Sequence, residues 1–327
     1  SIFFPVVEIL SALSLALLIW WGSREVLATT VTYGDLVAFL LYIYMLFRPI
    51  RQLADRFNTL QMGMVASERV FKVLDTEAQI AGSGVDVTPN IKGEIEFKNV
   101  WFAYNEEDWV LRDVSFKVKA GQRIAIVGAT GAGKTSIINI LSRFYEYNKG
   151  NILVDGTELR DFDARYLSRQ VGVVLQDVFL FSDSIYNNIT LNNSEIKLED
   201  VKAAAEQVGA NRFIDQLPDT YNFDVKERGG MLSVGQRQLL AFIRAYIYNP
   251  AILILDEATS SVDTETEMMI QEAIEQITKD RTSIIIAHRL ATVQYADLIM
   301  VMEKGEIVEI GSHQDLLKID GYYKNLY

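Results

Sequence analysis

Residues 128–135 read Gly-Ala-Thr-Gly-Ala-Gly-Lys-Thr and fit the pattern G-x-x-x-x-G-K-S/T. The apolar run Ile124–Val127 precedes this stretch, and the helix-forming run Ser136–Leu141 follows it. A strand, a glycine-rich loop and a helix are the context that the pattern requires. Glycines let backbone N–H groups close on phosphate oxygens, and the helix N-terminus adds a positive field. The stretch therefore predicts a phosphate-binding loop.

Around this loop, short β-rich runs alternate with helical patterns. The strands that we predict are Ile95–Val100, Arg123–Val127, Val171–Leu175, Ile252–Leu255, Ser283–Ile286 and Leu298–Val301. The helices that we predict are Lys134–Ser142, Val201–Val208, Gln236–Tyr248 and Glu265–Thr278. Apolar strands interleaved with helices indicate a mainly parallel sheet with both faces covered.

Two carboxylates follow one of these strands. The apolar run Ile252–Leu255 ends in Asp256 and Glu257, as in a Walker B element. With a phosphate-binding loop in the same chain, Asp256 is expected to help hold Mg²⁺, and Glu257 to polarise the attacking water as general base. Lys134 is expected to reach the β- and γ-phosphates, and Thr135 to bind Mg²⁺. The alternative is an acidic pair in a solvated loop.

A second helix start also has the chemistry of an anion site. In Leu232–Gln236, Ser233 is a natural N-cap, and Gly235 allows close approach of a ligand. The alternative is an ordinary capped helix. Because this start does not belong to the phosphate-binding loop, it needs a phosphate from elsewhere.

The N-terminal part is apolar. The run Ile2–Trp21 has 20 residues with one charge, Glu8, which is long enough to cross a bilayer core. Trp20 and Trp21 suit an interfacial anchor, whereas the alternative is a buried helix of a soluble domain. Glu8 either faces a pathway or lies near the inner interface. A polar loop is predicted at Gly22–Asp35.

The next apolar run, Leu36–Phe47, has 12 residues, a length that suits a membrane span or a core helix. Apolar residues then recur in steps of mostly three and four as far as Leu74, which predicts one helix, Leu36–Leu74, about 58 Å long. Pro49 is a position where it can kink. Arginines and lysines after residue 47 place that side in the cytoplasm by the positive-inside rule.

Composition narrows the class of protein. The chain has 327 residues, a mean hydropathy of +0.12 and a net charge of −12. The acidic balance argues against a nucleic-acid partner. With no cysteine and two histidines, thiolate sites and histidine-rich metal centres are excluded. The chain opens on Ser1 without the features of a signal peptide, so we expect the natural N-terminus to lie upstream.

The motifs together resemble the nucleotide-binding domain of ABC transporters. They occur in the order and spacing of that family, namely Gly128–Thr135, Gln176, Leu232–Gln236, Leu255–Glu257, Ser261–Asp263 and His288. The resemblance covers residues 94–327, and residues 1–75 resemble the last two membrane helices of a half-transporter exporter. It implies an α/β P-loop NTPase fold with a RecA-like core, an antiparallel β subdomain and an α-helical subdomain, after two transmembrane helices. Residues 76–93 are expected to be a linker.

The resemblance also implies roles for single residues. Tyr104 resembles the aromatic residue that stacks on adenine; the alternative is a surface strand aromatic. Gln176 resembles the Q-loop glutamine, which senses Mg²⁺ and faces the membrane domain. His288 resembles the switch histidine at the γ-phosphate, and Asp263 the aspartate that acts across the dimer. Residues 225–229 resemble the exporter loop that touches coupling helices, and the Ser233–Gln236 segment is implied to contact ATP held by a partner chain.

The expected site is therefore as follows. The catalytic residues are Lys134, Gln176, Glu257 and His288. The residues that bind ATP are Tyr104, Gly128, Ala129, Thr130, Gly131, Ala132, Gly133, Lys134, Thr135, Ser136, Gln176, Ser233, Gly235, Gln236 and Asp263. The residues that bind Mg²⁺ are Thr135, Gln176 and Asp256.

The function that the resemblance implies is export of a hydrophobic or amphipathic solute across a cell membrane, the bacterial inner or plasma membrane, driven by ATP hydrolysis. The implied partners are a second half-transporter, identical or different, the solute and membrane lipid. Two departures stand out: Val234 replaces the usual glycine, and four of the six membrane helices of the family are missing. The alternatives are a soluble ABC ATPase, a P-loop kinase or GTPase, a weakly active regulatory subunit and an importer.

Overall fold

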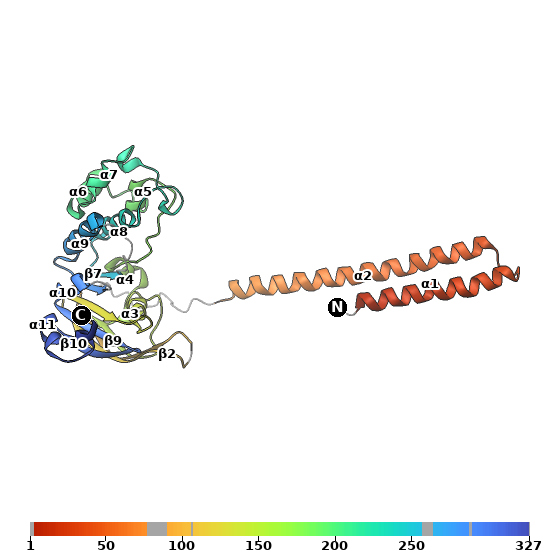
Figure 1. Ribbon diagram of the computed structural model, residues 1–327, viewed down its shortest axis with the longest axis horizontal. Helices are drawn as coiled ribbons and strands as arrows, with labels where there is room; N and C mark the ends of the chain where they lie inside the picture. The colour runs from red at the N-terminus through yellow and green to blue at the C-terminus, as the bar shows by residue number, and fades with distance from the viewer. Residues whose placement is uncertain (1–2, 77–89, 106, 257–263, 288–289, 327) are drawn as a thin grey trace. The chain divides into compact units, whose positions relative to one another are not determined.

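The computed structural model describes residues 3–76, 90–105, 107–256, 264–287 and 290–326 (Figure 1). The chain divides into two compact units, Ser1–Gln79 and Ile80–Tyr327. The first holds two long helices, and the second holds two sheets and the remaining helices.

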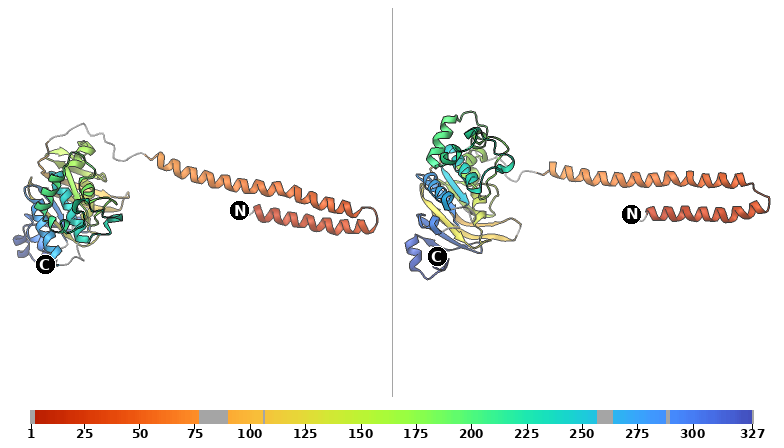
Figure 2. Two further views of the ribbon diagram at one scale, coloured as in Figure 1. Left: turned by 90° about the horizontal axis from the view of Figure 1, so that it is seen from above. Right: turned by 45° about the horizontal axis from the view of Figure 1, so that its top comes forward.

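The first unit is a helical hairpin. Helices α1 (Phe3–Leu27) and α2 (Tyr33–Leu74) run side by side in opposite directions (Figures 1 and 2). The single long helix predicted at Leu36–Leu74 is confirmed, and it continues through Pro49. The polar loop predicted at Gly22–Asp35 is wrong, because α1 extends to Leu27 and the connection covers only residues 28–32. Charged residues such as Arg24 are good helix formers, so polarity alone did not mark a loop.

Both helices are long and apolar enough to cross a membrane. The stretches that meet this test by length and composition are Pro5–Leu27 and Tyr33–Leu74. Where the helices meet, Arg51 Nη2 donates to Ser11 Oγ at 3.4 Å. The exposed apolar residues in the C-terminal half of α2 include Leu53, Phe57, Leu60, Met64, Phe71 and Leu74. The hairpin thus presents apolar surface that it does not bury itself.

The second unit is built on a six-stranded sheet. Its strands are β3 (Arg123–Gly128), β6 (Val171–Val174), β7 (Ile252–Asp256), β8 (Thr282–Ile286), β9 (Leu298–Glu303) and β10 (Glu306–Gly311). Their order is β10-β9-β3-β8-β7-β6, and all neighbours pair in parallel except β10 with β9. The mainly parallel sheet predicted from the alternation of strands and helices is confirmed.

A smaller antiparallel sheet lies beside it. Its order is β2-β1-β4-β5, formed by β1 (Ile95–Ala103), β2 (Trp109–Val118), β4 (Lys149–Val154) and β5 (Thr157–Glu158). The antiparallel subdomain implied by the family is therefore present. The prediction from the residues missed β2, β4, β5 and β10. These strands carry many charged or polar residues on their open faces, so they lack the continuous apolar runs of the parallel strands.

Alternation along the parallel strands builds two cores. In β3, Ile124 and Ile126 face the antiparallel sheet and α3 (Lys134–Leu141), whereas Ala125 and Val127 belong to the core of the other face. Strands β7, β8 and β9 alternate in the same way. One face of the six-stranded sheet is therefore covered by helices alone, and the other by α3 together with the small sheet. Both faces are buried, as is usual for a parallel sheet.

The remaining helices complete the unit. Helices α5 (Ile185–Thr190), α6 (Leu198–Val208), α7 (Asn211–Ile214) and α8 (Val234–Tyr248) gather at one end (Figure 1), the α-helical subdomain implied by the family. Helix α9 (Thr264–Thr278) packs on α6 and α8. In the described part of the unit, the other helices are α4 (Ala164–Gln170), α10 (Leu290–Gln294), α11 (His313–Lys318) and α12 (Tyr322–Leu326), with short 3₁₀ turns at Leu159–Asp161, Thr220–Asn222 and Glu227–Gly229.

Candidate nucleotide-binding site

The predicted phosphate-binding loop joins β3 to α3. Strand β3 ends at Gly128, and α3 begins at Lys134. The N-cap Gly133 has φ 100°, and a Cβ there would lie 2.7 Å from Leu111 Cδ2. Only glycine fits this left-handed and crowded position. The glycines of the motif thus set the path of the loop.

Lys134 lies inside this loop. Its side chain is buried, with 6% exposed, and Nζ donates to the carbonyl oxygens of Gly128 at 2.7 Å and Ala129 at 3.0 Å. Burial lowers the pKa of the Lys134 ammonium below its ordinary value, and the Asp256 carboxylate opposes this shift. A cation with little hydration is therefore held at the centre of the loop, where an anion gains most from pairing with it.

The start of α3 supplies further positive groups. Ser136 N makes the first hydrogen bond at the helix start, to Gly133 O at 3.1 Å, so the N–H groups of Gly133, Lys134 and Thr135 precede it. Among the described residues, no side chain caps this helix. The site therefore fits a phosphate group, which suits backbone N–H donors at a helix N-terminus.

Asp256 ends β7 at the same edge of the sheet. Strands β3 and β7 both pair in parallel with β8, so their carboxyl ends meet at one edge. Asp256 is half-buried, and Thr135 is exposed in the first turn of α3. A carboxylate and a hydroxyl are hard oxygen ligands that suit Mg²⁺, which takes its other ligands from phosphate and water. The donor chemistry thus fits the expected metal.

Tyr104 also reaches α3. Its hydroxyl lies 3.1 Å from Ser136 Oγ and accepts from Asn139 Nδ2 at 2.9 Å. The ring is 44% exposed, so one part stays open beside the loop. Sequence reasoning missed Asn139 and Tyr145, whose ring packs on that of Tyr104. Asn139 is one helical turn after Ser136, and that spacing was the available signal.

Gln176 is exposed just after β6, beside an apolar groove of about 520 Å³. The groove has Leu175, Phe179 and Phe181 along its wall, all exposed. Arg244 of α8 also lines it and donates to Phe179 O at 3.1 Å and Asn188 O at 2.6 Å. The segment after Gln176 is therefore tied directly to α8.

Ser233 is the N-cap of α8, as predicted. Its Oγ accepts from Gln236 N at 3.2 Å, and Gln236 Oε1 accepts from Ser233 N at 2.9 Å. Ser233 is exposed and Gly235 is buried. The Gln236 side chain is engaged in this capping box, which orients it toward the helix start. This start belongs to the α-helical subdomain, on a different element from the phosphate-binding loop.

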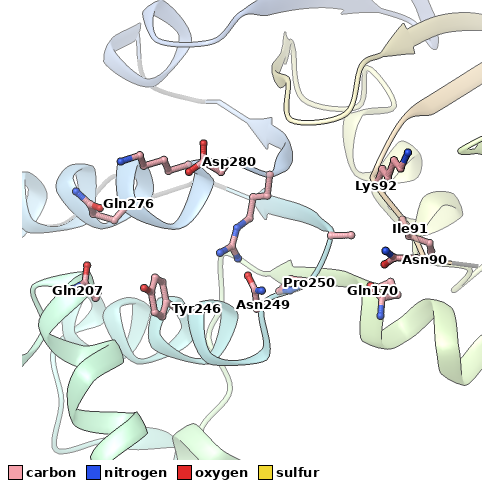
Figure 3. A pocket seen from close by; sticks show the side chains of 13 residues that line it. Asn90, Ile91, Lys92, Gln170, Gln207, Tyr246, Asn249, Pro250, Gln276 and Asp280 are labelled. Carbon is pink, nitrogen blue, oxygen red and sulfur yellow. The ribbon is translucent and has the colours of Figure 1, made fainter.

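A cavity of about 670 Å³ lies elsewhere (Figure 3). It is lined by Gln170, Ala251 and Arg281, each of which directly precedes a parallel strand, so it faces the amino ends of β6, β7 and β8. Tyr246, Asn249 and Gln276 also line it. Because the loop follows the carboxyl end of β3, this polar cavity is separate from the candidate site.

Three expected site residues lie outside the described residues. They are Glu257, Asp263 and His288. The positions of Glu257 and Asp263 in the sequence still place them just after β7, and that of His288 just after β8. Their roles stay predictions.

Comparisons with known proteins agree on one family. Residues 111–260 match the family described as ABC transporter. The probable multidrug resistance ABC transporter ATP-binding/permease protein YheH of Bacillus subtilis is 42% identical over 98% of this chain and 48% of its own length. The ATP-dependent lipid A-core flippase of Syntrophus aciditrophicus is 40% identical over 99% of this chain and 54% of its own.

A solved structure is also similar. A bacterial Atm1-family ABC exporter with ATP bound is 37% identical, with a TM-score of 0.74 over 98% of this chain and 56% of that chain. This chain therefore spans about half the length of the relatives it matches.

Proposed function

The chain belongs to the ABC transporter family and carries its ATP-binding domain, and on that premise we propose that it is the ATP-hydrolysing subunit of a membrane exporter. The observation that carries this proposal is the buried Lys134 ammonium in a glycine loop at the start of α3, with Asp256 at the same edge of the sheet. A buried cation beside the backbone N–H groups of a helix start favours a bound polyphosphate.

In this proposal the residues around the loop have separate roles in binding and hydrolysing ATP. Lys134 and the N–H groups of the loop bind the phosphates. Thr135, Asp256 and Gln176 hold Mg²⁺, which when bound neutralises phosphate charge. Glu257 takes a proton from the attacking water, and His288 contacts the γ-phosphate. These roles rest on the position of each residue in the family motifs and on the chemistry that phosphoryl transfer needs.

The same proposal makes the site shared between two chains. Ser233 and Gln236 start α8, on the α-helical subdomain, and α3 starts on the sheet. A phosphate bound by one chain would meet the exposed Ser233 of a second chain, with Asp263 contributing at the same junction. The exposed apolar residues of α2 would pack on the partner and on further membrane helices.

The link to the membrane is proposed to run through the groove beside Gln176. Its exposed aromatic wall, Phe179 and Phe181, suits an apolar helix from the cytoplasmic part of a membrane domain. Arg244 ties that wall to α8, so movement at the shared site would reach the groove. Residues 225–229, which touch coupling helices in the family, precede α8.

The solute is proposed to be hydrophobic or amphipathic. One relative bears a multidrug name and another a lipid A-core flippase name, and both kinds of molecule partition into membranes. The proposed location is the bacterial inner membrane, with the ATP-binding unit in the cytoplasm. The main alternative, a soluble ABC ATPase, leaves the two apolar helices without a role.

Reconstitution in lipid vesicles tests the proposal. We expect the full chain to stay in the membrane fraction after carbonate washing, and to hydrolyse ATP in a Mg²⁺-dependent way. Lipids, drugs and peptides would be compared as stimulators, with the Lys134→Ala variant as the inactive control. Release of the chain into the soluble fraction would favour the alternative, and hydrolysis unaffected by Lys134→Ala would overturn the site.

A further inference from the structure

Three aromatic rings meet beside the phosphate-binding loop. Tyr104 and Tyr145 pack edge to face, with ring centroids 4.9 Å apart and planes at 89°. Phe102 packs on Tyr104 at 4.7 Å and on Tyr145 at 6.0 Å. Phe102 is buried, whereas Tyr104 and Tyr145 are 44% and 45% exposed. The two tyrosines therefore form an open aromatic corner on a buried base.

Asn139 joins the two tyrosines. Its side-chain amide donates to the Tyr104 hydroxyl at 2.9 Å, and its backbone carbonyl accepts from Phe144 N at 2.8 Å and Tyr145 N at 3.4 Å. The residue lies in α3, which starts at Lys134. The Tyr104 hydroxyl and the Tyr145 backbone are thus both bonded to α3, the helix that carries Lys134.

The backbone around Tyr145 is also held. Arg143 has φ 52° and is buried, and its guanidinium donates to Phe162 O at 2.7 Å. It also pairs with Glu146 at 3.2 Å, on the other side of Tyr145. The buried Arg143, bonded on both sides of Tyr145, therefore fixes the backbone that carries the ring beside Tyr104.

We infer that Tyr145 is a positioning residue that holds the Tyr104 ring as a platform for the adenine base, with Asn139 as its anchor. The inference rests on the proposed function, because it assumes that the phosphates bind at Lys134. A tyrosine side chain has two free torsions, and fixing it before binding removes that entropy cost from the complex. The corner therefore acts on the base of the nucleotide, whereas the loop acts on the phosphates.

The test separates base from phosphates. In full-length chain in detergent, Tyr145→Leu is expected to weaken ATP binding about fivefold to tenfold, since stacking of a base on an aromatic ring is worth that much or more. Inorganic tripolyphosphate, which has no base, is expected to bind as in the wild type. Tyr145→Phe keeps the ring and is expected to keep ATP affinity. Tyr295→Leu, at an exposed tyrosine elsewhere in the unit, is the matched control.

A double-mutant cycle tests whether Tyr145 acts through Tyr104. Tyr145→Leu is expected to have no further effect on ATP affinity when Tyr104 is already leucine. ATP affinity within twofold of wild type in Tyr145→Leu, equal loss for ATP and tripolyphosphate, or additive effects would each overturn the inference. If the wild-type chain binds neither ATP nor tripolyphosphate, the proposed function fails instead.

Discussion

The two helix starts that are proposed to bind phosphate are built in opposite ways. Helix α3 starts at Gly133 with φ 100°, and its first turn holds the buried Lys134. Helix α8 starts at Ser233, whose side chain and that of Gln236 satisfy each other in a capping box. The start of α3 is open to an anion and the start of α8 is already capped.

This difference predicts unequal roles for the two starts in the proposed shared site. The open start has a cation and N–H groups, so it can bind a phosphate by itself. The capped start has no lysine in its first turn, and its capping groups bond to each other, so in the proposed shared site it adds the Ser233 hydroxyl to a phosphate that is already bound. We expect the first to control binding and the second to control turnover.

The largest effect is expected from a substitution that stops turnover and leaves the starts of α3 and α8 unchanged. Glu257→Gln should lower kcat for ATP hydrolysis by about 10²- to 10⁴-fold, because it removes the proposed general base. The dissociation constant for ATP should stay within about threefold of wild type, since the phosphate-binding groups remain. Steady-state hydrolysis and nucleotide binding would be measured on the same preparation. Normal turnover would rule out Glu257 as the base.

The second largest effect is expected from Lys134→Ala, which removes the cation from the start of α3. Loss of a buried cation paired with phosphate should raise the dissociation constant for ATP about 100-fold. Binding of a fluorescent ATP analogue measures this effect. Thr135→Ala serves for comparison, because its loss should act mainly through the Mg²⁺ concentration that the enzyme requires. Tight binding by the Lys134→Ala chain would contradict the role of the loop.

A smaller effect is expected at the capped start. Ser233→Ala should lower kcat about tenfold, because one donor to the transition state is lost, while ATP affinity of the dilute chain stays unchanged. Ser312→Ala is the matched control, because Ser312 caps α11 in the same way, with Oγ accepting from Asp315 N at 3.3 Å. Both changes should cost about 1 kcal/mol of stability. Equal kcat in the two variants would remove the functional role of Ser233.

The smallest effect is expected at Val234. Its side chain is 46% exposed and lies beside Gly235 rather than in its place. Val234→Gly, which restores the common form of the motif, should change kcat by less than about twofold. A tenfold gain would show that valine at this position limits the enzyme.

Local pattern decided what could be predicted from the sequence. The glycines and Lys134 encode a loop whose backbone angles depend on residue type, so the order strand, loop, helix is confirmed. Ser233 as a cap is confirmed for the same reason. Strands β2 and β4 owe their existence to pairing with β1, which a local pattern does not contain. The corner of Tyr104 and Tyr145 was missed because the fold brings distant residues together.

The helical hairpin gives a similar lesson. A continuous apolar seam predicted α2 as one helix. The end of α1 was predicted too early, because residues 22–27 include polar and charged side chains but are still helical. Polarity therefore marked the end of the apolar segment and not the end of the helix.

One measurement tests the shared site most directly. The chain has no cysteine, so single cysteines can be placed by Thr130→Cys in one preparation and Val234→Cys in another, both with Glu257→Gln. Both positions are exposed, one in the phosphate-binding loop and one at the capped start. If the site is shared, mixed chains in lipid vesicles form a cross-link between chains through a bifunctional thiol reagent when Mg²⁺ and ATP are present. Lys134→Ala should abolish it. In a further chain that carries both cysteines, a cross-link within one chain would contradict a shared site. So would the absence of an ATP-dependent cross-link between chains.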